Sequence, residues 1–225
     1  MSKGKQAFTP KARLIQILGE HLIKDATVGL LELVKNSYDA DATKVEILMS
    51  GLNTPTGKIV ISDNGCGMDL ETFLNKWMNP ASGHKQQQKD RQERTGLGRL
   101  PLGEKGVGRF AAQQIGNYFK MISKMLNGVE ELHVDINWSA FEDHSKDLSE
   151  VKIEYELRPA AIFKNARSGT VLEITSLKSE WKESDVKRVA NSLKRMKSPF
   201  KGATDFDISL KFENCPDEFS KYENI

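Results

Sequence analysis

The chain has 225 residues, 38% of them hydrophobic and 28% charged, which suits one large folded domain, alone or with a small extension. Its net charge of +2 gives no global electrostatic case for binding nucleic acid or a membrane surface, and no segment approaches the ~18 apolar residues of a transmembrane helix. The two cysteines, Cys66 and Cys215, form neither a metal-binding spacing nor a disulfide framework, so we expect a cytoplasmic protein.

Apolar residues recur at helical or alternating spacing along most of the chain, and Asp25 or Thr27 is placed to cap the second helix. The predicted elements are, in chain order, helices at 11–23 and about 25–39, strands at 44–49 and 58–62, helices at 69–78 and 108–116, strands at 117–126, 129–138, 151–158 and 169–175, a helix at 183–197 and a strand at 206–212. Consecutive strands lie mostly at hairpin spacing. This order predicts an α+β fold, a two-layer sandwich of a mixed, largely antiparallel sheet and helices, rather than a doubly wound parallel sheet.

Residues 79–105 interrupt this pattern. The segment holds two prolines, several glycines, three consecutive glutamines and seven basic residues. A loop of this length without secondary structure is usually functional or disordered. We interpret it as a mobile lid, because glycines of a phosphate-binding type close the segment; a disordered insertion is the alternative.

Three polar side chains share one face of the second predicted helix. At about 100° per residue, Asn36 lies roughly 40° from Glu32, and Asp39 lies roughly 20° from Glu32 on its other side. The opposite arc is mainly apolar and suits burial. A solvated polar face is the simpler interpretation of this helix when it is taken alone.

The motif Asp63-Asn64-Gly65-Cys66-Gly67-Met68 follows a predicted strand directly. A carboxylate at a strand end can accept a hydrogen bond from an exocyclic amino group such as that of adenine, and the glycines let the backbone turn and a flat ligand approach. An ordinary turn is the alternative, because Asp, Asn and Gly are the commonest turn residues.

Glycines also precede the helix predicted from residue 108, in Gly103-Glu104-Lys105-Gly106-Val107-Gly108-Arg109. Free backbone N–H groups at a helix start bind phosphate oxygens, and the helix dipole favours an anion there. A dinucleotide-binding fingerprint would need a buried strand just before the glycines, and residues 99–105 are poor strand material. No Walker A sequence occurs in the chain.

Taken in order, these motifs resemble those of the GHKL ATPases: gyrase B, the ninety-kilodalton heat-shock chaperones, histidine kinases and MutL, with the MORC proteins close by. The matching patterns are E-x-x-x-N-x-x-D-A from Glu32, D-x-G-x-G-M from Asp63 and G-x-x-G-x-G from Gly103. Residues 168–174 are similar to the family's Gly-Thr strand. The resemblance covers about residues 11–200 and implies the Bergerat ATP-binding fold.

The resemblance implies a role for each matching position. Glu32 orients or deprotonates the attacking water, and Asn36 binds Mg²⁺. Asp63 reads the adenine amino group beside Thr170. Ser82-Gly83-His84-Lys85 is similar to a Ser-Gly stretch in the chaperones' lid, which implies that Lys85 approaches the phosphates. The expected contacts to the nucleotide are Asn36, Asp39, Asp63, Gly65, Gly67, Met68, Lys85, Gly103, Gly106, Val107, Gly108, Arg109 and Thr170.

The expected function is therefore Mg-dependent ATP binding with slow hydrolysis, acting as an ATP-driven conformational or dimerisation switch in a larger protein. A nucleotide-sensing module with negligible hydrolysis is one alternative. A histidine-kinase-like phosphotransferase is disfavoured, because histidine kinases lack the hydrolytic Glu and no phospho-accepting His segment precedes Glu32. The sequence of the second helix looks nearest to the MutL, MORC and chaperone branch.

We expect a flexible N-terminus at 1–10, an ATP-binding domain at 11–200 and either a last strand or the start of a following domain at 201–225. Hydrolysing members usually receive a cation from a downstream domain, so we expect slow turnover and a homodimer formed through such a domain or on ATP binding.

The client, protein or DNA, stays open, and we expect no membrane partner. The basic residues of helix 183–197 favour a solvated face over a nucleic-acid contact.

Overall fold

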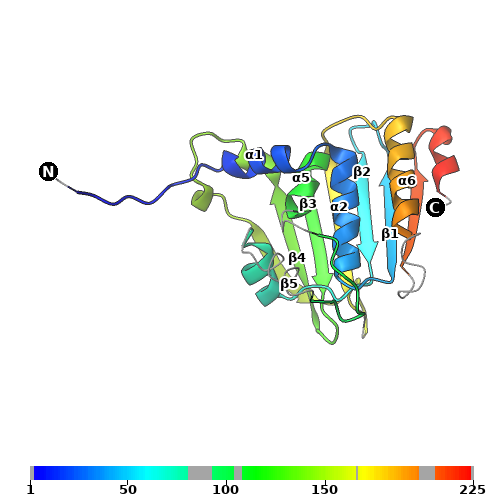
Figure 1. Ribbon diagram of the computed structural model, residues 1–225, viewed down its shortest axis with the longest axis horizontal. Coiled ribbons are helices and arrows are strands. Elements are labelled where there is room, and N and C mark those ends of the chain that lie inside the picture. The colour runs from blue at the N-terminus through cyan, green and yellow to red at the C-terminus, as the bar shows by residue number, and fades with distance from the viewer. Residues whose placement is uncertain (1–2, 81–92, 104–107, 166, 198–205, 224–225) are drawn as a thin grey trace.

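A computed structural model of the protein describes residues 3–80, 93–103, 108–165, 167–197 and 206–223. Within these residues the strands form one seven-stranded sheet in the order β5-β4-β3-β6-β2-β1-β7. All neighbouring strands are antiparallel except β1 and β7, which are parallel. Helices α1, α2, α5 and α6 lie on one face of this sheet (Figure 1). The predicted two-layer α+β sandwich is therefore confirmed.

The bounds of the elements follow the sequence prediction to within a few residues. The helices are α1 Arg13–Leu22, α2 Ala26–Asp39, α3 Leu70–Thr72, α5 Ala111–Ile115 and α6 Glu183–Lys197, with a π-helical turn η1 at Phe73–Trp77 and 3₁₀ turns η2 at Gly108–Phe110 and η6 at Asp217–Tyr222. The strands are β1 Lys44–Ser50, β2 Lys58–Asp63, β3 Gly116–Lys124, β4 Glu130–Asn137, β5 Glu154–Pro159, β6 Gly169–Leu177 and β7 Asp207–Glu213. The helix predicted at 69–78 is a single α-helical turn that continues as η1.

The core lies between the sheet and α2. Alternate residues of the strands, among them Ile47, Ile61 and Ile174, are buried on the helix side, as the period of two in a strand requires. They belong to one apolar cluster with Leu30 and Val34 of α2. The opposite face of the sheet carries charged residues. The fold therefore has one buried and one solvated sheet face, as is common for antiparallel sheets.

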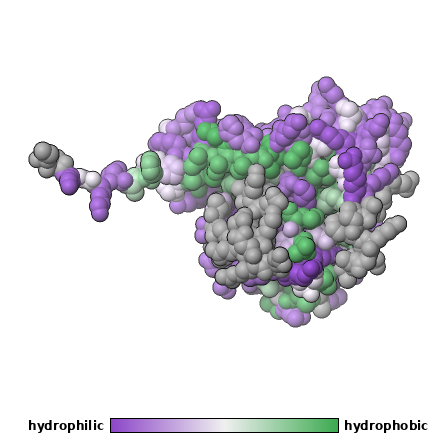
Figure 2. Space-filling model, in the orientation of Figure 1, coloured by the Kyte–Doolittle hydropathy of each residue, from purple (hydrophilic) through white to green (hydrophobic). Residues whose placement is uncertain are grey.

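The start of α2 is fixed by polar contacts. Asp25 caps the helix, because its carboxylate accepts the Val28 N–H at 3.0 Å. Arg188 of α6 reaches the same place, lying 3.2 Å from the Asp25 carboxylate and donating to the Thr27 hydroxyl at 2.6 Å. One cation of the basic helix thus joins α6 to α2. Figure 2 shows hydrophilic side chains gathered over the α6 region of this face.

The last strand belongs to the same sheet, because β7 pairs with β1 along its whole length, from Lys44 opposite Asp207 to Ser50 opposite Glu213. The following turn η6 packs on α6, where the Tyr222 hydroxyl donates to Glu183 at 2.9 Å. None of the helices in the described residues is long and apolar enough to cross a membrane.

Candidate nucleotide site

The Asp63 carboxylate at the end of β2 is held by three donors. The Ser37 hydroxyl of α2 donates to it at 2.7 Å, the Gly65 N–H at 2.9 Å and the Thr170 N–H at 3.2 Å. Burial is the largest influence on the pKa of Asp63 and raises it, while the hydrogen bonds oppose that shift. The site expected to read adenine is thus a carboxylate in a fixed orientation.

A second serine ties the neighbouring motif residues together. Ser123 of β3 accepts the Met68 N–H at 2.8 Å, and its hydroxyl lies 2.9 Å from the Thr170 hydroxyl. Ser168 donates to the Gly65 carbonyl at 2.8 Å. Ser123 and Ser168, neither of them an expected nucleotide contact, therefore join Met68, Gly65 and Thr170, which the sequence predicted to contact the nucleotide.

Gly67 occupies a position that only glycine fits. Its φ of +67° is left-handed, and a Cβ there would lie 2.0 Å from the Lys124 carbonyl oxygen. Lys124 is itself buried, and its ammonium donates to the carbonyls of Asn165 and Arg167 at 3.1 and 2.6 Å. The backbone of the Asp63 motif is therefore packed directly on β3 and on the loop before β6.

Asp39 at the end of α2 holds the segment that leads into the third motif. Its carboxylate accepts the N–H groups of Leu102 and Gly103 at 2.7 and 3.1 Å. Arg99, which is almost fully buried, lies over the Tyr38 ring and donates to the Ala42 carbonyl at 2.7 Å. The Asp39 side chain therefore positions the start of the glycine motif by binding the backbone of that segment.

Asn36 faces the end of the same motif. A Cβ on Gly108 would lie 2.9 Å from the Asn36 amide nitrogen and 3.2 Å from its amide oxygen, so the absence of a side chain on Gly108 permits this approach. Helix α2 thus supports two of the motifs near its end. Ser37 bonds Asp63, while Asp39 and Asn36 contact the two ends of the glycine motif.

Glu32, the predicted catalytic residue, lies one turn before Asn36 and is paired within its own helix. The Lys35 ammonium donates to its carboxylate at 2.6 Å, and both side chains are partly exposed. Arg109 is directed towards η1, where it donates to the Lys76 carbonyl at 2.8 Å and lies over the Trp77 ring at 5.7 Å. Burial lowers the pKa of Arg109 to about 10, so its guanidinium is charged at neutral pH.

The predicted contacts Lys85, Gly106 and Val107 lie outside the described residues, as does much of the predicted lid. The sequence did not single out Ser37, Ser123, Lys124 or Ser168 as site residues. Of these four residues, only Ser37 could have been identified from the sequence, since a serine on the otherwise apolar arc of a helix needs a buried hydrogen-bond partner.

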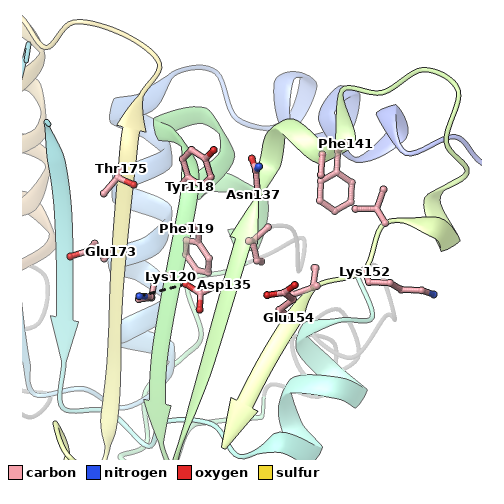
Figure 3. Close-up of a pocket in the computed structure, with 14 residues that line it drawn as sticks. Tyr118, Phe119, Lys120, Asp135, Asn137, Phe141, Lys152, Glu154, Glu173 and Thr175 are labelled. Atoms are coloured by element: carbon pink, nitrogen blue, oxygen red, sulfur yellow. Dashed lines mark ion pairs between the residues drawn. The ribbon is translucent and has the colours of Figure 1, made fainter. Parts of the chain in front are cut away.

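A hollow of about 450 Å³ opens on the other face of the sheet (Figure 3). Phe141 and Val151 form apolar walls, and Tyr118 and Asn137 are on its polar side. Its charges are partly neutralised, because Lys120 pairs with Asp135 at 3.7 Å. Among the described residues, none of the expected nucleotide contacts lines this hollow, and the strands separate it from α2. It is therefore distinct from the candidate nucleotide site.

Comparison with known protein families agrees with this geometry. Residues 25–170 match the family described as histidine kinase-, DNA gyrase B- and HSP90-like ATPases. The chain belongs to this family. The matched segment holds α2, the Asp63 motif, the glycine motif and Thr170, so membership supports an ATP-binding domain of the GHKL type.

Among curated proteins, the chain is similar to a putative type II restriction enzyme, HgiDII, of Herpetosiphon aurantiacus. The two are 37% identical over 106 residues, which are 47% of this chain and 16% of that protein. The chain thus matches about a sixth of the length of this relative.

Proposed function

We propose that this GHKL domain binds Mg·ATP through the residues around α2 and hydrolyses it slowly. The observation that supports this most strongly is the convergence of the motifs on one helix. Ser37 bonds the adenine-reading carboxylate, Asp39 holds the segment at Gly103, and Asn36 faces Gly108. A helix that supports both ends of one nucleotide site suits a domain that binds the base and the phosphates together.

The amide oxygen of Asn36, beside Gly108, fits Mg²⁺, because this ion takes few protein oxygens besides phosphate and water. When bound, Mg²⁺ would neutralise charge on the phosphates. In this proposal Asn36 holds the ion and Glu32 orients or deprotonates the attacking water.

The Glu32–Lys35 ion pair favours slow turnover. One oxygen of the Glu32 carboxylate accepts the Lys35 ammonium at 2.6 Å, so the Glu32 side chain must be redirected before that oxygen can accept a hydrogen bond from the attacking water. The same observation supports a second candidate, a nucleotide sensor with negligible hydrolysis. A phosphotransferase is less well supported, because Glu32 is present.

In a larger protein we propose that ATP acts as a conformational or dimerisation switch, in the manner of the MutL, MORC and chaperone branch. The restriction-enzyme relative makes DNA a partner class to test. Lys187, Lys194 and Arg195 are exposed on α6 and are the natural residues to vary in that test.

The proposed hydrolysis is tested with Glu32→Gln. We expect ATP affinity to be kept and turnover to fall by about 10²–10⁴-fold, the usual contribution of a general base. Glu20→Gln, at an exposed position of α1, is the matched control and should leave both unchanged. Wild-type turnover that equals that of Glu32→Gln would favour the sensor, and a folded wild type that binds no ATP would contradict both candidates.

A further inference from the structure

Strand β5 ends the sheet on the side away from β7 (Figure 1). In the part of the chain that the structure describes, β5 pairs only with β4, and all six of its residues are exposed. Tyr155 and Leu157 are 47% and 40% exposed. The other edge differs, because the Glu223 side chain accepts the Phe212 N–H of β7 at 2.9 Å and Phe219 of η6 packs on Phe212.

The backbone of β5 offers hydrogen-bonding groups to a further strand. The Ala160 N–H donates to the Val129 carbonyl at 3.2 Å, which fixes the residues that face β4. Since successive residues of an antiparallel strand bond to opposite sides, Tyr155, Leu157 and Pro159 direct their backbone groups away from β4. Pro159 has no N–H, and because its nitrogen is directed away from β4, the proline removes no hydrogen bond between β5 and β4.

We propose that β5 pairs antiparallel with β5 of a second copy of this chain, about a two-fold axis at Leu157. The two Leu157 residues then exchange both backbone hydrogen bonds, and each Tyr155 N–H donates to the Pro159 carbonyl of the second copy. On the helix side of the sheet, Leu157 packs on its counterpart and Tyr155 on Pro159 of the second copy. The two sheets become one.

Charge selects this register. With Leu157 on the axis, Glu156 lies opposite Arg158 of the second copy, twice by symmetry. Shifting the axis by one residue places Glu156 opposite Glu156, or Arg158 opposite Arg158, and like charges directly opposite each other are destabilising. Glu156 and Arg158 already pair at 2.7 Å within one chain, so both are extended over the outer face of β5. Charges and proline usually discourage edge pairing, and here they leave one self-complementary register.

The interface is small. A six-residue strand buries far less than the ~1,200 Å² of a standard interface, so the dimer is transient and forms at high protein concentration. It uses no residue of the candidate nucleotide site, and it therefore forms without ATP. This inference does not depend on the proposed function, since β5 pairing and ATP hydrolysis can each be present without the other.

Cysteine cross-linking tests the register. Leu157→Cys and Glu156→Cys are each made in a Cys66→Ser, Cys215→Ser background and oxidised with oxidised glutathione at near-millimolar protein. Directly opposed residues of a hydrogen-bonded pair have Cα atoms about 5.5 Å apart, within the range of a disulfide, whereas Glu156 and its counterpart are offset by two residues. We expect Leu157→Cys to form dimers at least tenfold faster than Glu156→Cys, and a mixture of Glu156→Cys with Arg158→Cys to form heterodimers.

Equal rates for the Leu157 and Glu156 variants, or no dimer from either, would overturn the proposal. Charge reversal tests it without cysteine. We expect Arg158→Glu to weaken self-association in sedimentation equilibrium and Glu156→Arg with Arg158→Glu to restore it. Wild-type protein that stays monomeric at near-millimolar concentration, or a double variant no better than Arg158→Glu, would also contradict it.

Discussion

The two ends of the candidate nucleotide site differ in how completely the protein holds them. At the adenine end, Asp63 accepts three hydrogen bonds, and Ser123 links Met68 to Thr170. At the phosphate end, Glu32 is paired with Lys35 and Arg109 is directed towards η1. The end expected to read the base is therefore preorganised, while the groups expected to act on the phosphates make other contacts.

This difference predicts unequal contributions of the two ends to affinity. A preorganised site loses little conformational entropy on binding, so adenosine alone should gain most of the affinity that the adenine end can give. The triphosphate must first redirect side chains at the phosphate end before their contacts add to the affinity. The experiments below test whether the ends are separable, from the largest expected effect to the smallest.

Gly67→Ala should damage the adenine end most severely. The new Cβ would lie 2.0 Å from the Lys124 carbonyl oxygen, on a residue with φ +67°, so we expect a loss of about 3 kcal/mol in unfolding free energy from strain and displacement, measured by urea unfolding. Gly98→Ala is the matched control. Its φ is +78° with open space around the new Cβ, so it should cost only about 1 kcal/mol. Equal losses would show that packing on β3 is unimportant.

Acidification should weaken adenosine binding at a pH above that of an ordinary aspartate, because burial raises the pKa of Asp63. The protonated carboxyl is a poorer acceptor for an amino group, so affinity should fall by up to about tenfold per pH unit below that pKa. The linkage to stability has the opposite sign: protonation of Asp63 stabilises the fold as pH falls through the raised pKa. Calorimetry across pH measures the first effect, and a flat profile would contradict it.

Asp39→Ala should damage the phosphate end selectively. It removes the acceptor for the Leu102 and Gly103 N–H groups, so the glycine motif loses its anchor. We expect ATP affinity to fall about tenfold, in line with about 1.4 kcal/mol, with adenosine affinity unchanged. The control is Asp41→Asn, which alters a hydrogen bond to the Leu97 N–H, further along the chain from the glycine motif, and should have less effect on ATP affinity. An equal loss for adenosine would mean that the two ends are not separable.

Lys35→Met should have the smallest effect. It frees Glu32 from an ion pair between partly exposed side chains, worth only about 0.5 kcal/mol, so we expect turnover to rise about twofold. Lys24→Met, at an exposed position, is the control and should change nothing. A fall in turnover would instead assign Lys35 a direct part in the reaction.

The sequence predicted the fold class and nearly all the elements, because helical and alternating periodicities are local properties. It also predicted the polar face of α2, whose Asn36 and Asp39 each contact the glycine motif or the segment before it. It could not predict Ser123, since its contact with Met68 spans 55 residues and depends on the register of β3 against β6. The same limit applies to β7, whose parallel partner β1 lies more than 150 residues away in the sequence.

The most direct test of the account is calorimetric titration of wild type and Asp63→Asn with ATP and Mg²⁺, with GTP as the control ligand. Asp135→Asn, on the solvated sheet face, is the control variant. We expect wild type and Asp135→Asn to bind ATP in preference to GTP, and Asp63→Asn to lose about 2 kcal/mol of binding free energy, as for a hydrogen bond to a charged group. Unchanged ATP affinity in Asp63→Asn, or no nucleotide binding by folded wild type, would contradict the assignment of the adenine end.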